Sequence, residues 1–258
     1  MSLKNIVRMV NMNSRITPKV QRWLMNHDGV HIQSDFVTQR VMQILKPEIK
    51  KSRAGAFHPS QLYQCQRAQV YGYYDAPTIK KFDAQLQNIF NDGHFRHLRW
   101  QIMLLEAGIL TDVEVAVDVP KLRLQGSMDG VNSDEGWMFE LKGTSQFKGV
   151  QSKGVMPAHI KQVHAYLLGS GLKEAIVVYE CKSTQQWVEV VVPKDPKIIE
   201  EIETILESLN DAIDNDYLPE RLEDCENKTG ATYNSCAYAK ICHGCNKPSD
   251  IATLVQIK

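Results

Sequence analysis

Residues 126–143, GSMDGVNSDEGWMFELKG, place charged side chains inside two segments that otherwise have the composition of β-strands. The apolar runs LRLQGSMDGV and WMFELKG flank NSDEG, a turn-forming sequence, so the pattern predicts a β-hairpin. Asp, Glu and Lys are poor strand residues and are rarely buried without partners. Asp129, Glu140 and Lys142 therefore either point into water or meet on one face for a chemical purpose.

The register of this hairpin decides which side chains meet. A turn centred in NSDEG places Asp129 opposite Glu140, and directly paired residues project from the same face of a sheet. Lys142 follows Glu140 by two residues and shares its face, because side chains alternate along a strand. We therefore expect these three charged side chains to converge. Phe139 and Leu141 are expected to face the opposite core.

Two carboxylates and a lysine that meet on one face of a hairpin can form a metal site. Two carboxylates a few ångströms apart repel each other, and one of them tends to take up a proton. A divalent cation removes that conflict, and hard oxygen ligands suit Mg²⁺ or Mn²⁺ with positions left for water and a phosphate oxygen. A neighbouring lysine can orient or deprotonate the attacking water, or stabilise negative charge that develops on phosphate. The alternative is a solvated hairpin with a cross-strand ion pair.

The order of periodic segments along the chain predicts an α/β fold. Strand periodicity is found at 113–119, 122–131, 137–143, 175–182 and 187–193. Helices are expected at 84–107, 157–169 and 197–215, and an aromatic-rich helix within 58–75. We expect one domain with a mixed central sheet flanked by helices. Its parts are a helical region (1–83), a core (84–193) and a C-terminal helix with a cysteine-bearing tail (194–258).

Composition narrows the function classes. The chain has 258 residues, and its hydrophobic fraction of 43% is enough for a substantial core. Lys plus Arg and Asp plus Glu are both 30, so a surface that binds a polyanion has to be local. No apolar run approaches the length of a membrane helix. The first 27 residues are basic without a secretory signal pattern, which favours a basic N-terminal arm over an organelle transit peptide. We therefore expect a cytoplasmic location in a bacterium or phage-infected cell.

The charged hairpin resembles a known nuclease signature. An Asp, a hairpin turn and then Glu-x-Lys mark the PD-(D/E)XK nucleases, and here they read Asp129 followed by Glu140-Leu141-Lys142. Two helix motifs, GHFRH at 93–97 and QVHAY at 162–166, are similar to those of the RecB-type branch of that superfamily. In this order, the motifs imply a restriction-endonuclease-like core between residues 93 and 166.

The resemblance implies a role for each matched residue. The ligands of Mg²⁺ or Mn²⁺ would be Asp129, Glu140, the Leu141 carbonyl and His97. His94 lies close enough in the sequence to compete with His97. Lys142 would act on the nucleophilic water. Gln162 and Tyr166 are four residues apart, so they share a helix face and would position that water or the DNA strand.

The cysteines suggest a second metal centre. Six cysteines without a secretory signal pattern indicate metal binding more than disulfides, and the tail CENKTGATYNSCAYAKICHGC at 225–245 is typical of a zinc or iron–sulfur site. The sequence is similar to CRISPR-associated and phage RecB-type nucleases that hold a 4Fe–4S cluster with one upstream and three C-terminal cysteines. The ligands implied are Cys65, Cys225, Cys236 and Cys242. Cys245 is the alternative to Cys225, zinc is the alternative to the cluster, and Cys181 is expected in the core.

These features favour a metal-dependent DNA nuclease. The resemblance implies an exonuclease that acts on single- or double-stranded DNA ends in recombination, repair or phage DNA processing, alongside recombination or replication proteins. Lys148, Lys153 and Lys161 surround the predicted site and are candidate phosphate contacts. The rival hypotheses are a sequence-specific endonuclease and a non-catalytic DNA-binding subunit held together by its cysteines. The latter would have no need of the complete set of Asp, Glu, Lys and Gln.

Overall fold

Five strands form one mixed sheet in the spatial order β1-β2-β3-β4-β5. They are β1 (Asp112–Val119), β2 (Leu124–Asn132), β3 (Trp137–Thr144), β4 (Glu174–Cys181) and β5 (Trp187–Pro193). Neighbouring strands are antiparallel except β3 and β4, which are parallel and are connected through α6 and α7. The computed structural model describes residues 14–27, 34–45, 53–78, 84–226, 228 and 230–251.

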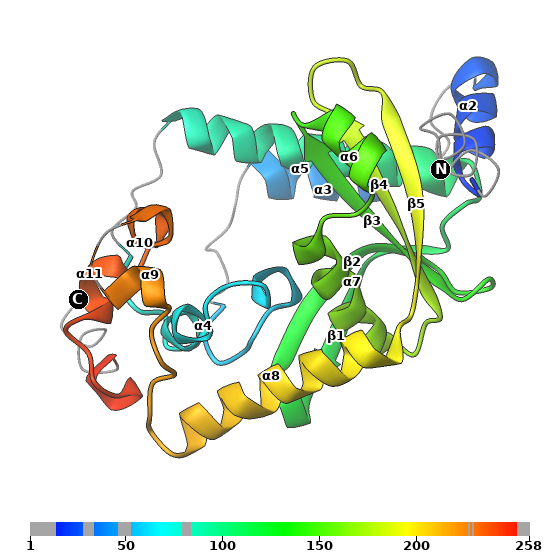
Figure 1. The fold of residues 1–258 in the computed structure, drawn as a ribbon. Coiled ribbons are helices and arrows are strands. Elements are labelled where there is room, and N and C mark those ends of the chain that lie inside the picture. The colour runs from blue at the N-terminus through cyan, green and yellow to red at the C-terminus, as the bar shows by residue number, and fades with distance from the viewer. Residues whose placement is uncertain are drawn as a thin grey trace.

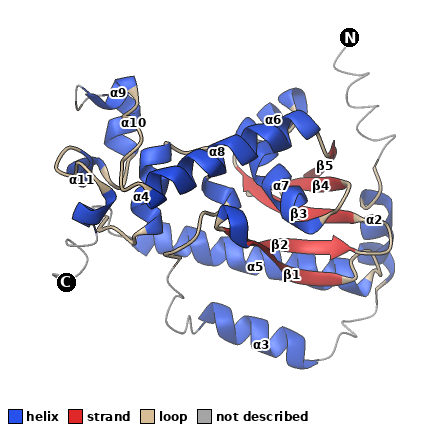
Figure 2. Cartoon of the chain, turned by 90° about the horizontal axis from the view of Figure 1, so that it is seen from below, coloured by secondary structure: helices blue, strands red, loops and turns tan. Residues whose placement is uncertain are grey.

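Helices cover both faces of the sheet (Figures 1 and 2). One face carries α2 (Thr17–Asn26) and α5 (Ala84–Glu106), with α3 (Ser34–Leu45) outside α5. The other face carries α6 (Phe147–Lys153), α7 (Pro157–Ser170) and the long α8 (Pro196–Asp214). The remaining helices, α4 (Gln66–Tyr73), α9 (Glu223–Glu226), α10 (Gly230–Ser235) and α11 (Ala239–Cys242), gather at one end of the molecule. No helix in the described ranges is long and apolar enough to cross a membrane.

The prediction of an α/β fold with a mixed sheet flanked by helices is confirmed. All five strands lie where their periodicity indicated, and α5 ends one residue before the predicted boundary, because Gly108 there adopts a left-handed φ of +61°. The prediction of one helix within 58–75 is wrong in its first half. A 3₁₀ turn (Pro59–Gln61) and a bend precede α4. Lys4 and Arg8 of the predicted basic arm lie outside the described residues.

The hairpin of β2 and β3 has the predicted register. The paired residues are Gly130 with Phe139, Val131 with Met138 and Asn132 with Trp137, so the next position sets Asp129 opposite Glu140. The backbone ladder stops there, and the Asp129 carboxylate accepts the Leu141 amide proton at 2.7 Å instead. The two strands therefore diverge at the first predicted carboxylate.

A change of face in β1 accompanies this divergence. Val113 packs in the core on the α5 side, whereas Val115 packs in the core on the α7 side. Residues two apart share a face in a regular strand, so the strand reverses its alternation between them. The residue between them is Glu114, with a left-handed φ of +52°. This conformation is strained for a residue other than glycine, and it lies beside Asp129 in the β1–β2 register.

The sheet separates two cores, as the hairpin pattern predicted. Phe139 and Leu141 pack against Trp100 and Leu104 of α5. On the other side, Met138 lies in the core with the apolar residues of α7. Glu140 and Lys142, which alternate with Phe139 and Leu141, therefore project toward α7. A third core joins α4, α8 and the C-terminal region.

A buried carboxylate ties the first described residues to the last strand. Glu189 of β5 is 4% exposed and accepts hydrogen bonds from the backbone amides of Arg15, Ile16 and Thr17. The hydroxyls of Ser14 and Thr17 donate to it at 2.6 and 2.9 Å. Because α2 has no side-chain cap from its own N-cap residue Ile16, Glu189 satisfies the amides at the start of this helix.

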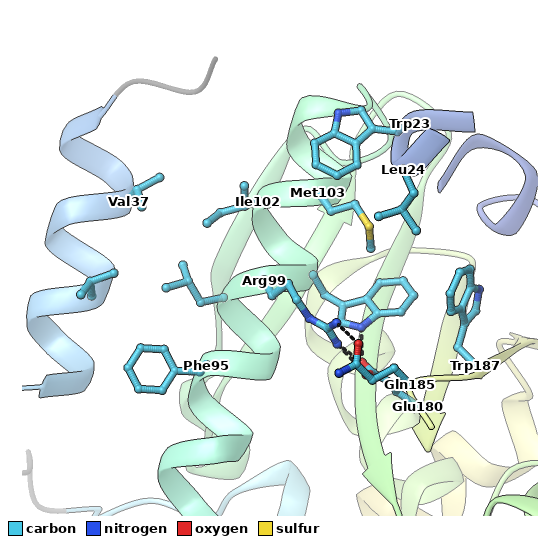
Figure 3. A pocket seen from close by; sticks show the side chains of 13 residues that line it. Trp23, Leu24, Val37, Phe95, Arg99, Ile102, Met103, Glu180, Gln185 and Trp187 are labelled. Carbon is cyan, nitrogen blue, oxygen red and sulfur yellow. Dashed lines mark hydrogen bonds and ion pairs between the residues drawn. The ribbon is translucent and has the colours of Figure 1, made fainter. Parts of the chain in front are cut away.

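An apolar hollow of about 590 Å³ lies between α3 and α5 (Figure 3). Val37 of α3 faces Phe95 and Ile102 of α5 across it. At its base, Arg99 forms an ion pair with the buried Glu180 at 2.5 Å. Helix α3 is therefore seated over α5 with incomplete apolar packing between them.

Candidate active site

A cleft of about 910 Å³ opens where β2 and β3 diverge. Its floor is formed by Asp129, Glu140 and Lys142. The N-terminal half of α5 contributes one wall, with Phe90, Gly93, His94 and His97. The segment around the 3₁₀ turn contributes another, with Arg53, His58 and Pro59. The three charged residues of the hairpin thus share one solvent-connected space, as their register predicted.

His97 reaches this floor from α5. Its Nδ1 lies 3.2 Å from Asp129 Oδ1, while His94 lines the cleft one helical turn earlier. Burial alone would lower the pKa of His97, but the charge and hydrogen bond of Asp129 outweigh burial and hold that pKa above its ordinary value. Burial would raise the pKa of Asp129, but His97 and the Leu141 amide hold it below its ordinary value. Each of the two side chains thus stabilises the charged form of the other within the cleft.

Glu140 has two differently placed oxygens. Its Oε1 accepts hydrogen bonds from Lys142 Nζ at 2.6 Å and Gln162 Nε2 at 2.9 Å, and Gln162 Oε1 accepts from Lys142 Nζ at 2.8 Å. Its Oε2 is buried and has no hydrogen-bond partner among the described residues. An unpartnered buried carboxylate oxygen is costly, so this atom marks a position where a cation or a proton belongs.

The ionisation of Glu140 supports the same interpretation. Burial raises its pKa, the charge of Asp129 raises it further and Lys142 partly offsets both, which gives a value of about 7. Burial would lower the pKa of Lys142, but Glu140 and Asp129 hold it above its ordinary value. Lys142 is therefore protonated at neutral pH, while Glu140 is ready to exchange a proton for a metal ion.

The residues fit a Mg²⁺ or Mn²⁺ ion. Asp129 and Glu140 supply hard oxygen ligands, and the backbone between them runs through Leu141, whose amide already contacts Asp129. A cation at Oε2 of Glu140 would provide its missing partner and reduce the repulsion between the carboxylates. Within the described ranges, no three His, Cys, Asp or Glu side chains form a ready-made ligand set for one ion. The fit therefore depends on the carboxylates together with backbone and water oxygens.

Helix α7 supplies the predicted Gln162 and Tyr166. Gln162 contacts both Glu140 and Lys142, and Tyr166 lines the cleft one turn later. Burial raises the pKa of Tyr166 above its ordinary range, so its hydroxyl stays protonated. A Cβ atom on Gly126 would lie 2.8 Å from the Tyr166 ring, so only glycine lets this ring pack against β2.

His159 is a neighbour of the site that no motif in the sequence indicated. Its Nδ1 lies 2.6 Å from the hydroxyl of Tyr179, which is paired with Lys142 across β3 and β4. Burial and the charge of Lys142 lower the pKa of His159 to about 4, so its ring is neutral. His159 precedes Gln162 by three residues, and this shared helix face was the signal that could have identified it.

The predicted phosphate contacts lie elsewhere. Lys148 and Lys153 are exposed on α6 and Lys161 is half-buried on α7, and none of the three lines the cleft. The basic residues that do line it include Arg40, Arg53 and Lys182. They come from α3, from the segment before the 3₁₀ turn and from the end of β4, so no local pattern connects them. Residues 46–52, just before Arg53, lie outside the described residues.

Four of the six cysteines meet around one small cavity. Cys65, Cys225, Cys236 and Cys242 line a space of about 40 Å³ between α4 and the C-terminal helices. Burial raises the pKa of Cys225, and the other three thiols raise it further. Cys245 is 2% exposed and packs in the apolar core beside α4 and α8. Cys181 is buried in β4, as expected.

Comparisons with known proteins give a distant likeness. No family model matches the chain, and no curated protein matches it in sequence. An alkaline exonuclease (LHK-Exo) from Laribacter hongkongensis is 19% identical, with a TM-score of 0.49 over 63% of this chain and 90% of that one. Its complex with dAMP is 18% identical, with the same TM-score and coverage. The protein SSO0001 is 16% identical, with a TM-score of 0.47 over 81% of this chain and 95% of that one. Likeness at this level does not decide function, which has to be argued from the site.

Proposed function

We propose that this chain is a metal-dependent DNA nuclease of the PD-(D/E)XK type, and specifically an exonuclease of the RecB-type branch that processes DNA ends. The observation that carries the proposal is the buried Oε2 of Glu140, which has no hydrogen-bond partner among the described residues although Lys142 and Gln162 both bond to Oε1. A binding subunit without catalysis gains nothing from an arrangement that leaves a buried carboxylate unsatisfied. A hydrolase that binds a cation needs a carboxylate oxygen that is open to the ion, as Oε2 of Glu140 is.

In this proposal, Asp129, Glu140, the Leu141 carbonyl and His97 would hold Mg²⁺ or Mn²⁺. When bound, the ion supplies Lewis-acid activation of water and of the scissile phosphate. Lys142 keeps its proton because Glu140 lies 2.6 Å away, so its ammonium group can orient the attacking water and stabilise charge on the phosphate. Gln162 fixes both Glu140 and Lys142, so it positions the two groups relative to each other.

The substrate class follows from the cleft. A divalent ion and an ammonium group at the same point suit the negative charge that develops when a phosphodiester is cleaved. Arg53 and Lys182 line the cleft without an acidic partner among the described residues, so both can contact phosphates beside the scissile bond. The exonuclease assignment rests on the motifs GHFRH and QVHAY. A sequence-specific endonuclease is the second candidate, and it would cut circular DNA into defined fragments.

A 4Fe–4S cluster is proposed for the cysteine-lined cavity, with Cys65, Cys225, Cys236 and Cys242 as ligands. Their common cavity supports this set over one that includes Cys245, which is packed in the apolar core. When bound, the cluster would cross-link α4 to the C-terminal region. Zinc is the alternative occupant, and visible absorption together with iron and zinc analysis distinguishes the two.

One assay tests the proposed activity. The purified protein is incubated with end-labelled linear single-stranded and duplex DNA, and with closed circular DNA, in Mg²⁺, Mn²⁺ or EDTA. We expect progressive shortening of linear DNA with metal and none in EDTA. Absence of cleavage under every metal condition, with the protein folded, would contradict the proposal. Cleavage of circular DNA into defined fragments would favour the endonuclease.

A further inference from the structure

Glu114 of β1 is a third carboxylate in the cleft, and it has an unusual environment. Its Oε1 accepts hydrogen bonds from Arg40 of α3 at 2.6 Å and from Gln101 Nε2 at 2.9 Å, and its Oε2 accepts from Ser127 at 3.2 Å. Gln101 Nε2 also donates to the backbone carbonyl of Asp129 at 3.0 Å. The carboxylate is thus linked through one side chain to the catalytic strand β2.

The backbone of Glu114 adopts a strained conformation, which costs folding free energy. Its φ of +52° is adopted without strain only by glycine, yet a glutamate occupies this turning point of β1. The change of face explains why the backbone is left-handed, but it does not explain the carboxylate. Both Arg40 and Glu114 line the same cleft as Asp129 and Glu140, so Arg40 is within the space that a DNA strand bound at the floor would occupy.

The ion pair between Arg40 and Glu114 is placed so that a DNA phosphate could replace Glu114 as the partner of Arg40. The side chain of Arg40 is 24% exposed and that of Glu114 is 37% exposed, and a partly exposed ion pair of this kind is weak. A guanidinium group binds phosphate with geometry as favourable as carboxylate. Helix α3, which carries Arg40, is seated over α5 across the apolar hollow, where Val37 faces Phe95 and Ile102 (Figure 3).

We propose that Arg40 is a phosphate-binding residue that Glu114 holds in the DNA-free protein, so that Glu114 competes with the DNA backbone for the same guanidinium group. The inference rests on the proposed nuclease function, and it goes beyond that function by assigning the cleft an internal competitor of its substrate. Glu114 thereby weakens binding of DNA, and Arg40 strengthens it. The two residues act through each other, which makes their effects non-additive.

The experiment measures DNA binding by fluorescence anisotropy in EDTA, with a short single strand and the matching duplex, over a series of salt concentrations. Glu114→Gln keeps the strained backbone and removes the charge, whereas Glu114→Gly removes both. We expect both variants to bind DNA about threefold to tenfold more tightly than the wild type. Arg40→Ala should bind more weakly by a similar factor, with a salt slope on single strands smaller by about 0.7.

The double variant Arg40→Ala/Glu114→Gln should bind DNA like Arg40→Ala alone, because without the Arg40 guanidinium Glu114 has no group for which it competes with DNA. Asp214→Asn is the matched control, since Asp214 pairs with Arg123 at the same 2.6 Å on a surface that does not line the cleft. We expect it to bind DNA like the wild type. Equal tightening by Glu114→Gln and Asp214→Asn would reduce the effect to net charge and overturn the proposal.

Two other results also overturn it, and circular dichroism confirms that each variant is folded. One is an Arg40→Ala protein that binds DNA as tightly as the wild type. The other is a Glu114→Gln protein with unchanged binding but lost metal-dependent cleavage, which would make Glu114 a metal ligand. If the wild type cleaves DNA and Arg40→Ala binds DNA as tightly as the wild type, only the role of Arg40 is contradicted and the nuclease function stands. Wild-type protein that neither binds nor cleaves DNA contradicts the nuclease function as well.

Discussion

The carboxylate site and the cysteine-lined cavity are both candidate metal centres, and the chain builds them by different means. Asp129, Glu140 and Lys142 lie on a β-hairpin in the middle of a five-stranded sheet, with Glu140 only 3% exposed and held by Lys142 and Gln162. Three of the four cysteines lie on or beside helices of four, six and four residues. The first two of these helices, α9 and α10, bury no residue.

The difference concerns what each site contributes to folding. Glu140 is ordered by the pairing of β3 with β4, and Asp129 by the bond that it accepts from the Leu141 amide, so a metal ion there would be recruited for chemistry and its loss would leave the fold intact. The C-terminal helices have little apolar burial to stabilise them, so a cofactor bound to the cysteines would supply folding free energy. One centre should fail in activity when it is damaged, and the other should fail in stability.

The largest effect is expected at the carboxylate site. Glu140→Gln preserves shape and removes the charge beside Asp129, and Lys142→Ala removes the ammonium group. We expect either change to reduce the cleavage rate by at least about 10²–10³-fold while the protein still folds. Single-turnover cleavage and circular dichroism test this. Asp134→Asn, in the exposed turn of the same hairpin, is the control and should retain full activity. Normal turnover by both active-site variants would refute the assignment.

A loss of stability is expected at the cysteines. A cross-link from Cys65 to the C-terminal region closes a loop of about 160 residues, which corresponds to roughly 4–5 kcal/mol in the simple chain-entropy model. Cys65→Ala, Cys225→Ala, Cys236→Ala or Cys242→Ala should therefore abolish the brown colour of anaerobically prepared protein and lower its melting temperature strongly. Cys181→Ala and Cys245→Ala should keep the colour. A colourless wild-type protein with one bound zinc per chain would exclude the iron–sulfur cluster, and zinc would then form the cross-link between the cysteines.

An intermediate effect is expected at His97, which contacts Asp129 and lies on α5 instead of the sheet. His97→Ala should weaken Mg²⁺ or Mn²⁺ binding by about 10–100-fold without unfolding the protein. Mn²⁺ should restore more activity than Mg²⁺, because Mg²⁺ demands a near-ideal octahedral shell and tolerates the loss of one ligand less well. Titration calorimetry in both metals tests this. If His94→Ala shows this behaviour and His97→Ala does not, the ligand on α5 has been misassigned.

The smallest effect is expected at His159, and it concerns pH. Its pKa is about 4 in the folded protein against an ordinary value of 6.5, because burial and the charge of Lys142 oppose protonation. The unfolded chain therefore binds a proton that the folded protein refuses, and stability falls as the pH decreases from about 6.5 toward 4. His159→Gln should lose less stability than the wild type between pH 7 and pH 5 in urea unfolding. An equal loss in both proteins would show that this ring does not titrate as described.

Much of the carboxylate site could be predicted because β-hairpins have a simple periodicity. A turn sequence between two apolar segments fixes the register, and the register fixes which side chains share a face. Asp129 opposite Glu140 followed from that rule, and so did the burial of Phe139 and Leu141 on the other face. Gln162 was predicted from the resemblance of QVHAY to the RecB-type helix motif, and α7, which carries it, packs over the sheet beside Glu140.

The rest depends on contacts between distant parts of the chain. The left-handed conformation of Glu114 has no signal in the sequence, since glycine would be the expected residue there. Arg40, Arg53 and Lys182 approach the cleft from three unrelated segments, while the lysines chosen for their nearness in sequence project elsewhere. The neutral state of His159 arises from its burial and from the charge of Lys142 on β3.

The bonds from Ser14, Arg15, Ile16 and Thr17 to Glu189 set a limit on how far the N-terminus can be trimmed. A shortened protein that begins after Thr17 would leave a carboxylate, 4% exposed, without its donors. Removing one side of such a buried charged contact costs about 3–5 kcal/mol, a large share of the stability of an ordinary domain. Expression of shortened versions for crystallisation should therefore start upstream of Ser14, and digestion by proteases should leave this junction intact while the protein is folded.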